Sequence, residues 1–278
     1  MGLGGYLTWT AVAEEIKKKL GKDVKFLPVE KYGNNFRLVE SEIFEHNKNF
    51  TSRIEDANTS FPIILNNPNA NYCKLDTPEK AYHRHDSHII EQACEVYDIK
   101  NPVLKCYLDL HEQEVEHVEN LIREIGANQF IAIEPSSKDN YTVNRRYSFE
   151  KWQMIANELK NLYPIIQIGN SEKLLKNVVN LTGKTTFSQA AGLLGRSRLF
   201  LSTEGGLVHA ATAFSTKSVV VITGYQSEKM VAYPQNININ ISKHGPCGLK
   251  KQCDQCFSDV ENHDWQEIVE KVKRELQK

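Results

Sequence analysis

The residue types best suited to chemistry follow an apolar run in the last third of the chain. Residues 202–206 read Ser-Thr-Glu-Gly-Gly, and a helix-like stretch with His209 in its first turn begins at Leu207. Two glycines let a ligand approach the backbone, a helix N-terminus attracts anions, and a carboxylate accepts hydrogen bonds from hydroxyl groups. This pattern predicts a site for a phosphate-bearing sugar, although a structural turn with a core histidine would use the same residue types. The candidate binding residues here are Thr203, Glu204, Gly205, Gly206 and His209.

A second polar group follows the strand-like run at residues 130–133. Lys138, Arg145 and Arg146 could neutralise a diphosphate, because the forked guanidinium of arginine matches phosphate oxygens. Hydroxyl groups and a glycine at other expected strand ends could complete such a site, and a solvent-exposed basic loop is the alternative. The residues expected to take part are Ser136, Ser137, Lys138, Arg145, Arg146, Gly169 and Thr185.

A third group is the run His-Arg-His-Asp-Ser-His at residues 83–88. His85 and Asp86 have the chemistry to remove a proton from an acceptor hydroxyl, so they are candidate catalytic residues. The same side chains suit a metal site. The alternative without chemistry is a polar loop in which Asp86 or Ser87 caps a helix.

Three cysteines near the C-terminus form a fourth group. Cys247, Cys253 and Cys256 have the spacing C-x5-C-x2-C, and His244 or His263 could add a fourth ligand. Where thiols stay reduced, this spacing favours zinc or iron over a disulfide. A cluster of thiols without metal remains the alternative.

The composition limits the class of protein. The 278 residues are 40% hydrophobic and 25% charged, and 34 basic side chains nearly balance 35 acidic ones. We therefore expect a globular protein without a nucleic-acid partner. No apolar run approaches the ~20 residues of a membrane span, and no secretory signal is evident, so we expect a cytoplasmic location.

The elements that must position these groups are clearest in the second half. Apolar runs alternate with amphipathic stretches, which is typical of a parallel α/β sheet, and every candidate loop lies at the carboxyl end of an expected strand. The expected strands are 130–133, 165–168, 199–201, 219–222 and 236–241, and the expected helices begin at the caps Ser148 and Thr186, at Leu207 and at Asp264.

The first half is less regular. A Gly-rich turn at residues 2–5 is expected to lead into a helix that ends at Gly21, and residues 30–71 show only a weak pattern apart from a strand at 61–65. Further elements are a strand at 24–27 and helices at 88–97 and 112–125. We place a domain boundary at residue 128, with a second domain at 129–262 and a C-terminal helix at 263–278.

At this point residues 129–260 resemble the donor domain of glycosyltransferase family 9, the heptosyltransferase-like enzymes. Five pieces of that family's pattern occur in order, with Glu204 in place of the usual Asp. They are Glu134-Pro-Ser-Ser137, the stretch from Arg145 to Trp152, Gly169, the stretch from Thr182 to Thr185, and the stretch from Glu204 to His209.

The resemblance implies an α/β protein of the GT-B type, with two Rossmann-like domains facing a cleft and the last helix packing back toward the N-terminal domain. It implies inverting transfer of a sugar from a nucleotide-activated donor to a glycan or other hydroxyl acceptor, as in lipopolysaccharide or glycan biosynthesis. No metal is needed for that reaction, so zinc or iron at the cysteines would be structural. Gly5 stands where the family has the Asp proposed as its catalytic base, which leaves the base unassigned.

Two other functions fit the same residues. A sugar-nucleotide epimerase shares the architecture and has a similar acidic-Gly-Gly turn, with His85 or Asp86 as acid or base. A binding protein that has lost catalysis would account for Gly5.

Overall fold

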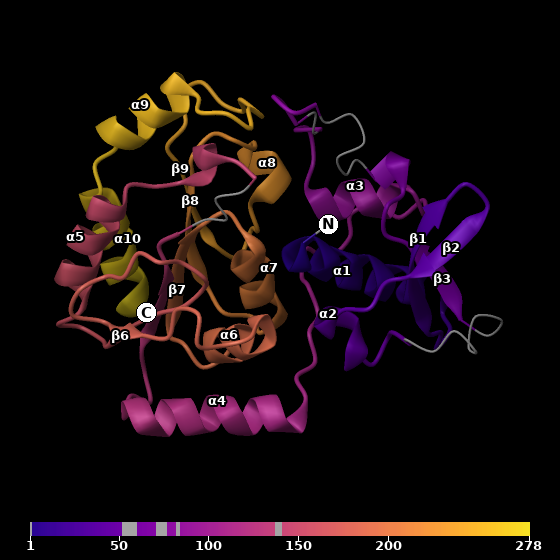
Figure 1. Cartoon of the computed structure of the whole chain (residues 1–278), viewed down its shortest axis with the longest axis horizontal. Coiled ribbons are helices and arrows are strands. Elements are labelled where there is room, and N and C mark those ends of the chain that lie inside the picture. The colour runs from indigo at the N-terminus through magenta and orange to yellow at the C-terminus, as the bar shows by residue number, and fades with distance from the viewer. Residues whose placement is uncertain (1, 52–59, 71–76, 82–83, 137–140) are drawn as a thin grey trace.

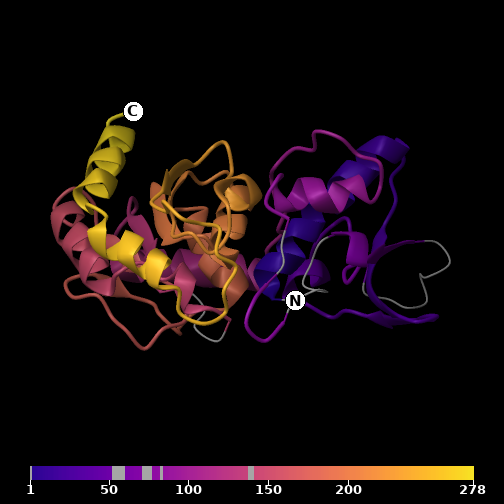
Figure 2. The ribbon, with the colours of Figure 1, turned by 90° about the horizontal axis from the view of Figure 1, so that it is seen from above.

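The described residues form two β-sheets. The computed structural model describes residues 2–51, 60–70, 77–81, 84–136 and 141–278. The N-terminal sheet has the strand order β2 (Asn35–Leu38), β1 (Phe26–Tyr32) and β3 (Phe61–Ile64). The C-terminal sheet has the order β6 (Val179–Asn180), β5 (Ile165–Gln167), β4 (Ile131–Glu134), β7 (Leu199–Thr203), β8 (Ser218–Ile222) and β9 (Ile237–Asn240). Figures 1 and 2 show the two sheets in separate lobes.

Helices cover both faces of the six-stranded sheet. On one face lie α6 (Phe187–Leu194) and α7 (Gly206–Ala213), and on the other lie α5 (Phe149–Leu159) and α10 (Gln266–Leu276). All five strand pairings are parallel. Alternate residues of β7 enter opposite cores, with Phe200 on the α6–α7 side and Leu199 and Leu201 on the α5–α10 side. A strand buried on both faces explains the continuous apolar runs in the sequence.

The two helix caps expected in this half, Ser148 and Thr186, are confirmed. Ser148 Oγ accepts a hydrogen bond from the Lys151 N–H at the start of α5, and Thr186 forms a capping box with Gln189 at the start of α6. Such caps satisfy N–H groups that have no partner within the helix. The sequence analysis missed β6 and the helices α8 (Glu228–Val231) and α9 (Asp254–Asn262), which are too short or too polar to show a clear period.

In the N-terminal half, α1 (Leu3–Leu20), α2 (Glu42–Glu45) and α3 (Ile89–Glu95) pack into a core that is continuous with the α6–α7 side of the six-stranded sheet. Strand β1 pairs parallel with β3 and antiparallel with β2, so the weak pattern after residue 30 conceals a hairpin and a short helix. The expected turn at residues 2–5 is wrong. Gly2 is the N-cap of α1, and Gly4 and Gly5 belong to its first turn.

Helix α4 (Glu112–Ile125) lies below the C-terminal lobe in Figure 1. Its buried Val118 packs against α6, where a Cβ on Gly192 would lie 3.0 Å from the Val118 side chain. The helix precedes the expected boundary at residue 128 but packs on the C-terminal half. The division at 128 therefore stays a proposal.

The C-terminal helix differs from its expected place. Helix α10 packs on α5 and β8, with Ile268, Val269 and Val272 buried in the core they share. Lys217 Nζ, just before β8, pairs with a carboxylate oxygen of Glu275 at 3.1 Å. Figure 2 shows this helix at the end of the molecule away from the N-terminal lobe. The apolar face of α10 thus covers the sheet of its own half, and the expected return to the N-terminal half is wrong.

Within the described ranges, we find no helix whose length and hydrophobicity would let it cross a membrane.

Candidate functional site

Glu204 lies at the carboxyl end of β7 with its carboxyl group buried. The residue is only 3% exposed, and among the described residues neither carboxylate oxygen has a hydrogen-bond partner. Burial raises the pKa of Glu204 to about 7, although the charge of Arg145 and the nearby N–H groups of Glu204 and Thr223 oppose the rise. A buried carboxyl without a partner costs stability, and a ligand that hydrogen-bonds to it would offset that cost.

A second buried carboxyl, which the sequence analysis did not select, ends the neighbouring strand β4. Glu134 ends β4, and the parallel register places it opposite Ser202 of β7. Ser202 Oγ donates a hydrogen bond to Glu134 Oε2 at 3.2 Å, and burial raises the pKa of Glu134 to about 7. A Cβ on Gly169 would lie 2.9 Å from Glu134 Oε1, so this glycine, whose φ is 97°, leaves room for the carboxyl. The signal was an acidic residue directly after a buried strand.

The two glycines before α7 have different surroundings. Gly205 is the N-cap, and a Cβ there would meet only Thr203 O at 3.9 Å and Glu134 Oε2 at 4.0 Å. Gly206 instead packs against α1, because a Cβ on Gly4 would lie 2.5 Å from Gly206 Cα. The N-termini of α1 and α7 therefore meet, and both present their positive ends to the same region. A ligand could therefore approach the backbone closely at Gly205, whereas Gly206 packs against α1.

Arg145 faces this region from the 3-10 turn Val143–Arg145. Its guanidinium donates a hydrogen bond to Gln226 Oε1 and lies over the rings of Tyr225 (5.1 Å) and Tyr141 (5.9 Å). Its Nε is buried and, in the part of the chain that is described, has no hydrogen-bond partner. An oriented cation with an unused donor is suited to bind a phosphate oxygen.

His209 joins the site through a buried hydrogen-bond network. Its Nδ1 lies 2.6 Å from the hydroxyl oxygen of Tyr233, which also lies 3.5 Å from Cys106 Sγ. The ring of His88 packs edge-on against Tyr233 at 4.7 Å. Burial, and the nearby positive charge of Arg145, lower the pKa of His209 to about 4. His209 is therefore neutral at pH 7, and both a binding role and a structural role fit its contacts.

The structure separates the two candidate catalytic residues. Ser227, next to Gln226, donates to His85 twice, from its N–H to Nδ1 (3.4 Å) and from its Oγ to the backbone oxygen (3.0 Å). Burial lowers the pKa of His85. Asp86 instead pairs with Arg84 at 2.7 Å and is well exposed. His85 thus approaches the Arg145 side of the site, whereas Asp86 faces solvent.

Neither Asp86 nor Ser87 caps the helix that follows. The N-cap of α3 is His88, whose Nδ1 accepts the Ile90 N–H while Glu91 bonds back to the His88 N–H. The imidazole takes the place of the expected carboxylate or hydroxyl. His88 is also deeply buried, and burial lowers its pKa to about 3.

The remaining candidates are scattered around the strand ends. Ser136 Oγ donates to Ser171 Oγ at 2.9 Å, and Thr203 is buried in β7. The Thr185 hydroxyl is buried and has no hydrogen-bond partner among the described residues. Arg146 is exposed. Ser137 and Lys138 lie outside the described residues.

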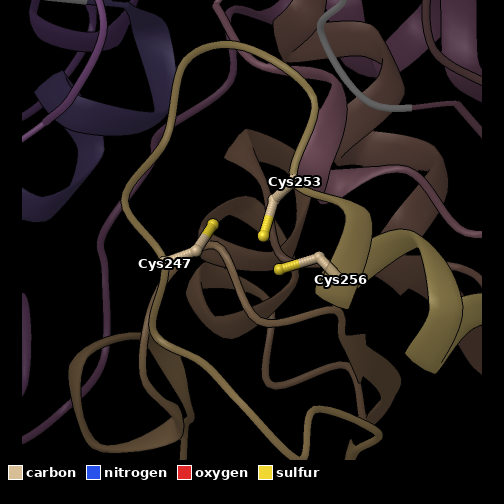
Figure 3. Close-up of side chains that lie close together, drawn as sticks. All are labelled: Cys247, Cys253 and Cys256. Atoms are coloured by element: carbon tan, nitrogen blue, oxygen red, sulfur yellow. The ribbon is translucent and has the colours of Figure 1, made fainter.

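The three cysteines converge as their spacing indicates. Their sulfur atoms lie within 4.8 Å of one another, and Figure 3 shows Cys247, Cys253 and Cys256 pointing toward a common centre. Hydrogen bonding from Cys256 lowers the pKa of Cys247 below its usual value. Three converging thiols fit a soft metal such as zinc or iron.

Neither proposed histidine belongs to this cluster. His263 Nδ1 lies 2.8 Å from the Tyr147 hydroxyl, and His244 Nδ1 lies 3.5 Å from an Asp259 oxygen. A fourth ligand from these two residues would require them to leave their present contacts.

A pocket of about 260 Å³ lies elsewhere, between α4 and α6. Its lining includes Arg196 and Phe214, which precede the starts of β7 and β8. The pocket therefore belongs to the amino edge of the sheet. In parallel α/β sheets ligands bind at the carboxyl edge, so we favour the Glu204 site.

A family model described as glycosyltransferase family 9 (heptosyltransferase) matches residues 79–260, more than half of the chain. A comparison with curated protein sequences finds no match.

Several solved structures are similar. Escherichia coli ADP-heptose LPS heptosyltransferase II is 17% identical with a TM-score of 0.54, covering 69% of this chain and 62% of its own. A family 9 glycosyltransferase from Veillonella parvula is 12% identical with a TM-score of 0.66, covering 100% and 95%. TibC, an iron-containing dodecameric glycosyltransferase from enterotoxigenic E. coli H10407, is 13% identical with a TM-score of 0.68, covering 100% and 74%.

At these identities the similarity shows the fold alone. The expected α/β fold of the GT-B type is confirmed. The chain spans less than two thirds of the length of heptosyltransferase II.

Proposed function

Because the chain belongs to glycosyltransferase family 9, the heptosyltransferase family, we propose that it transfers a sugar from a nucleotide-activated donor to a hydroxyl group of a glycan. The observation that carries the proposal is the cluster at the carboxyl edge of the six-stranded sheet. There the unused Nε of Arg145, the unpartnered carboxyl of Glu204 and the N-terminus of α7 lie within electrostatic reach of one another.

In this proposal the donor's diphosphate lies between Arg145 and the N-cap Gly205. Arg145 supplies a charged donor, and the free N–H groups at the start of α7 supply a partial positive charge. Both act on the oxygens whose negative charge grows as the sugar–phosphate bond breaks, which is where stabilisation speeds the reaction. TibC has been solved with ADP-D-beta-D-heptose, and we propose an ADP-sugar of this class as the donor here.

Glu204 contacts the sugar or ribose in its protonated form. A pKa of about 7 leaves the carboxyl largely neutral below neutral pH, so it can donate a hydrogen bond without repelling the diphosphate. Above pH 7 Glu204 ionises, and its negative charge then lies beside a ligand that is already negatively charged. We therefore expect donor affinity to fall as the pH rises through about 7.

The acceptor hydroxyl attacks the anomeric carbon from the opposite side, which inverts the configuration. We retain His85 and Asp86 as candidates for the base. If Nδ1 of neutral His85 keeps the Ser227 N–H, the proton lies on Nε2, which then donates rather than accepts. Base catalysis by His85 would require this contact to break, and a pH–rate profile of His85→Gln beside Asp86→Asn tests both assignments.

Gly5 favours one alternative, a protein that binds the donor without transferring the sugar. The residue lies in the first turn of α1 and offers no side chain for proton transfer. Incubation with ADP-sugars and candidate acceptors separates these functions. Acceptor-dependent release of ADP supports a transferase, a changed sugar supports an epimerase, and binding without turnover supports the alternative.

The decisive binding test compares Arg145→Ala with Arg274→Ala, a control on the exposed side of α10. Calorimetric titration with ADP and with adenosine measures the phosphate contribution separately. Loss of a charge-assisted bond should weaken ADP binding by about 1.5–3 kcal/mol and leave adenosine nearly unchanged. Equal losses for both ligands would show that Arg145 does not contact phosphate.

We further propose that Cys247, Cys253 and Cys256 bind one zinc or iron ion with a structural role. The support is the convergence of the three sulfur atoms, and TibC is described as iron-containing. Elemental analysis of protein purified without chelator should find about one equivalent per chain. Cys253→Ser should lower the metal content, whereas Cys94→Ser, which changes a buried thiol elsewhere, should not. Three neighbouring free thiols also suit a reducing compartment, and we propose a cytoplasmic location.

A further inference from the structure

Asn144 connects the loop at residues 247–253, which we call the cysteine loop, to the turn that contains Arg145. Its Nδ2 donates hydrogen bonds to the carbonyl oxygens of Leu249 (2.6 Å) and Lys251 (2.8 Å), and its Oδ1 accepts one from the Cys253 N–H (2.8 Å). Both hydrogens and the oxygen of the side-chain amide are therefore hydrogen-bonded to this one loop. Asn144 is 5% exposed, so a lost bond would leave a buried polar group unpaired.

The backbone of Asn144 is held from the opposite side. Thr223 Oγ1, just after β8, donates a hydrogen bond to the Asn144 carbonyl oxygen at 2.7 Å. Thr142 Oγ1 accepts the Asn144 N–H at 3.2 Å and donates to Leu249 O at 2.8 Å. Arg145 is the next residue in the same short turn. Its backbone therefore cannot move without disturbing contacts between Asn144, the sheet and the loop.

The loop is also tied to the sulfur cluster and to the N-terminal half. Cys247 and Cys253 stand at its two ends, and the Leu249 N–H points at Cys247 Sγ (3.5 Å). On the other side the Ala81 N–H donates to Gly248 O at 2.8 Å. A metal bound by these sulfur atoms would fix both ends of the loop. The middle of the loop, at Leu249 and Lys251, accepts the hydrogen bonds from Asn144.

We propose that Asn144 is a positioning residue through which metal bound at Cys247, Cys253 and Cys256 orients Arg145 for the donor's diphosphate. The inference rests on the proposed metal and diphosphate sites and adds a link between them. Metal binding fixes the loop, the loop fixes the Asn144 amide, and the turn then holds the guanidinium over Tyr225. Because binding by a guanidinium depends on geometry, a displacement of about 1 Å matters even when the charge is retained.

The first measurement follows the turn itself and needs no nucleotide. Hydrogen–deuterium exchange is compared for peptides covering residues 142–147 in metal-loaded and chelator-treated protein, with residues 153–159 of α5 as an internal folding control. Metal removal should speed exchange in the first segment and not in the second. Asn144→Ala should exchange as fast as chelated wild type even when its metal content is normal.

The second measurement titrates ADP and adenosine into loaded and stripped forms of wild type, Asn144→Ala and the exposed control Asn157→Ala. Coupling between two sites commonly amounts to about a fivefold change in affinity or more. We expect metal removal to weaken ADP binding by at least that factor in wild type and in Asn157→Ala. In Asn144→Ala, ADP binding should be weak in both forms and no longer depend on metal, while adenosine binding changes little throughout.

The outcomes separate this inference from the proposals beneath it. Protein that takes up no zinc or iron refutes the metal site and the link together. Failure to bind ADP refutes the proposed donor class, and the exchange of residues 142–147 still decides the link. Metal-loaded and stripped protein with the same exchange in this turn, or a metal effect that persists in Asn144→Ala, overturns the inference while leaving both sites in place.

Discussion

Replacing Glu204 with Gln should change the pH dependence of folding in a calculable way. In the folded protein burial raises the pKa of Glu204 to about 7, whereas its ordinary value is 4.5. The folded state therefore binds more protons than the unfolded state between these values. The contribution of Glu204 to stability thus falls as the pH rises through this window and levels off above it. Glutamine keeps the shape and cannot ionise.

The size of the effect follows from the two pKa values. At about pH 8 the ionised carboxyl costs the folded protein about 3 kcal/mol relative to a group with its ordinary pKa, and at about pH 5 the cost is about 1 kcal/mol. The stability of Glu204→Gln relative to wild type should therefore increase by about 2 kcal/mol from the lower to the higher pH. His88 and His209 titrate abnormally as well, with opposite sign, but both proteins contain them and the difference isolates Glu204.

Urea unfolding at both pH values measures this difference, with Glu124→Gln on the exposed side of α4 as the matched control. The control should differ from wild type by nearly the same amount at each pH. A difference between Glu204→Gln and wild type that stays constant from about pH 5 to about pH 8 would refute the reasoning, because it would mean that Glu204 titrates normally in the folded protein. The same variant should bind ADP more tightly than wild type at the higher pH.

Two further substitutions test the packing around the site. Gly4→Ala should destabilise the protein by about 1–3 kcal/mol, since its Cβ would lie 2.5 Å from Gly206 Cα. Gly2→Ala is the control, because its Cβ would meet no atom within 4 Å. Equal melting temperatures of the two variants in calorimetry would contradict this prediction. Tyr233→Phe should lower the free energy of urea unfolding by about 1–3 kcal/mol, because the hydroxyl lies 2.6 Å from Nδ1 of half-buried His209. An unchanged midpoint for Tyr233→Phe would mean that water replaces the hydroxyl.

Local pattern was sufficient wherever a helix or strand carries its own signal. The alternation of Leu199, Phe200 and Leu201 between two cores and the capping box at Thr186 follow from side-chain chemistry within a few residues. The convergence of the cysteines also followed from their spacing. By contrast, the prediction that α10 packs on the N-terminal half was wrong. The apolar face of α10 could cover either half, and the spacing of apolar residues along the chain does not show which surface needs covering.

The sequence by itself determined the parallel α/β half, its helix caps and the polar residues at its strand ends, because these depend on local period and on residue type. Only the tertiary structure decided which of those polar groups meet. It placed Glu134 beside Gly205, used Gly206 to pack on Gly4, and turned Asp86 away toward Arg84. It also linked Asn144 to the cysteine loop over about a hundred residues of chain. Such pairings arise from the register of parallel strands and the packing of helix ends, which no local pattern records.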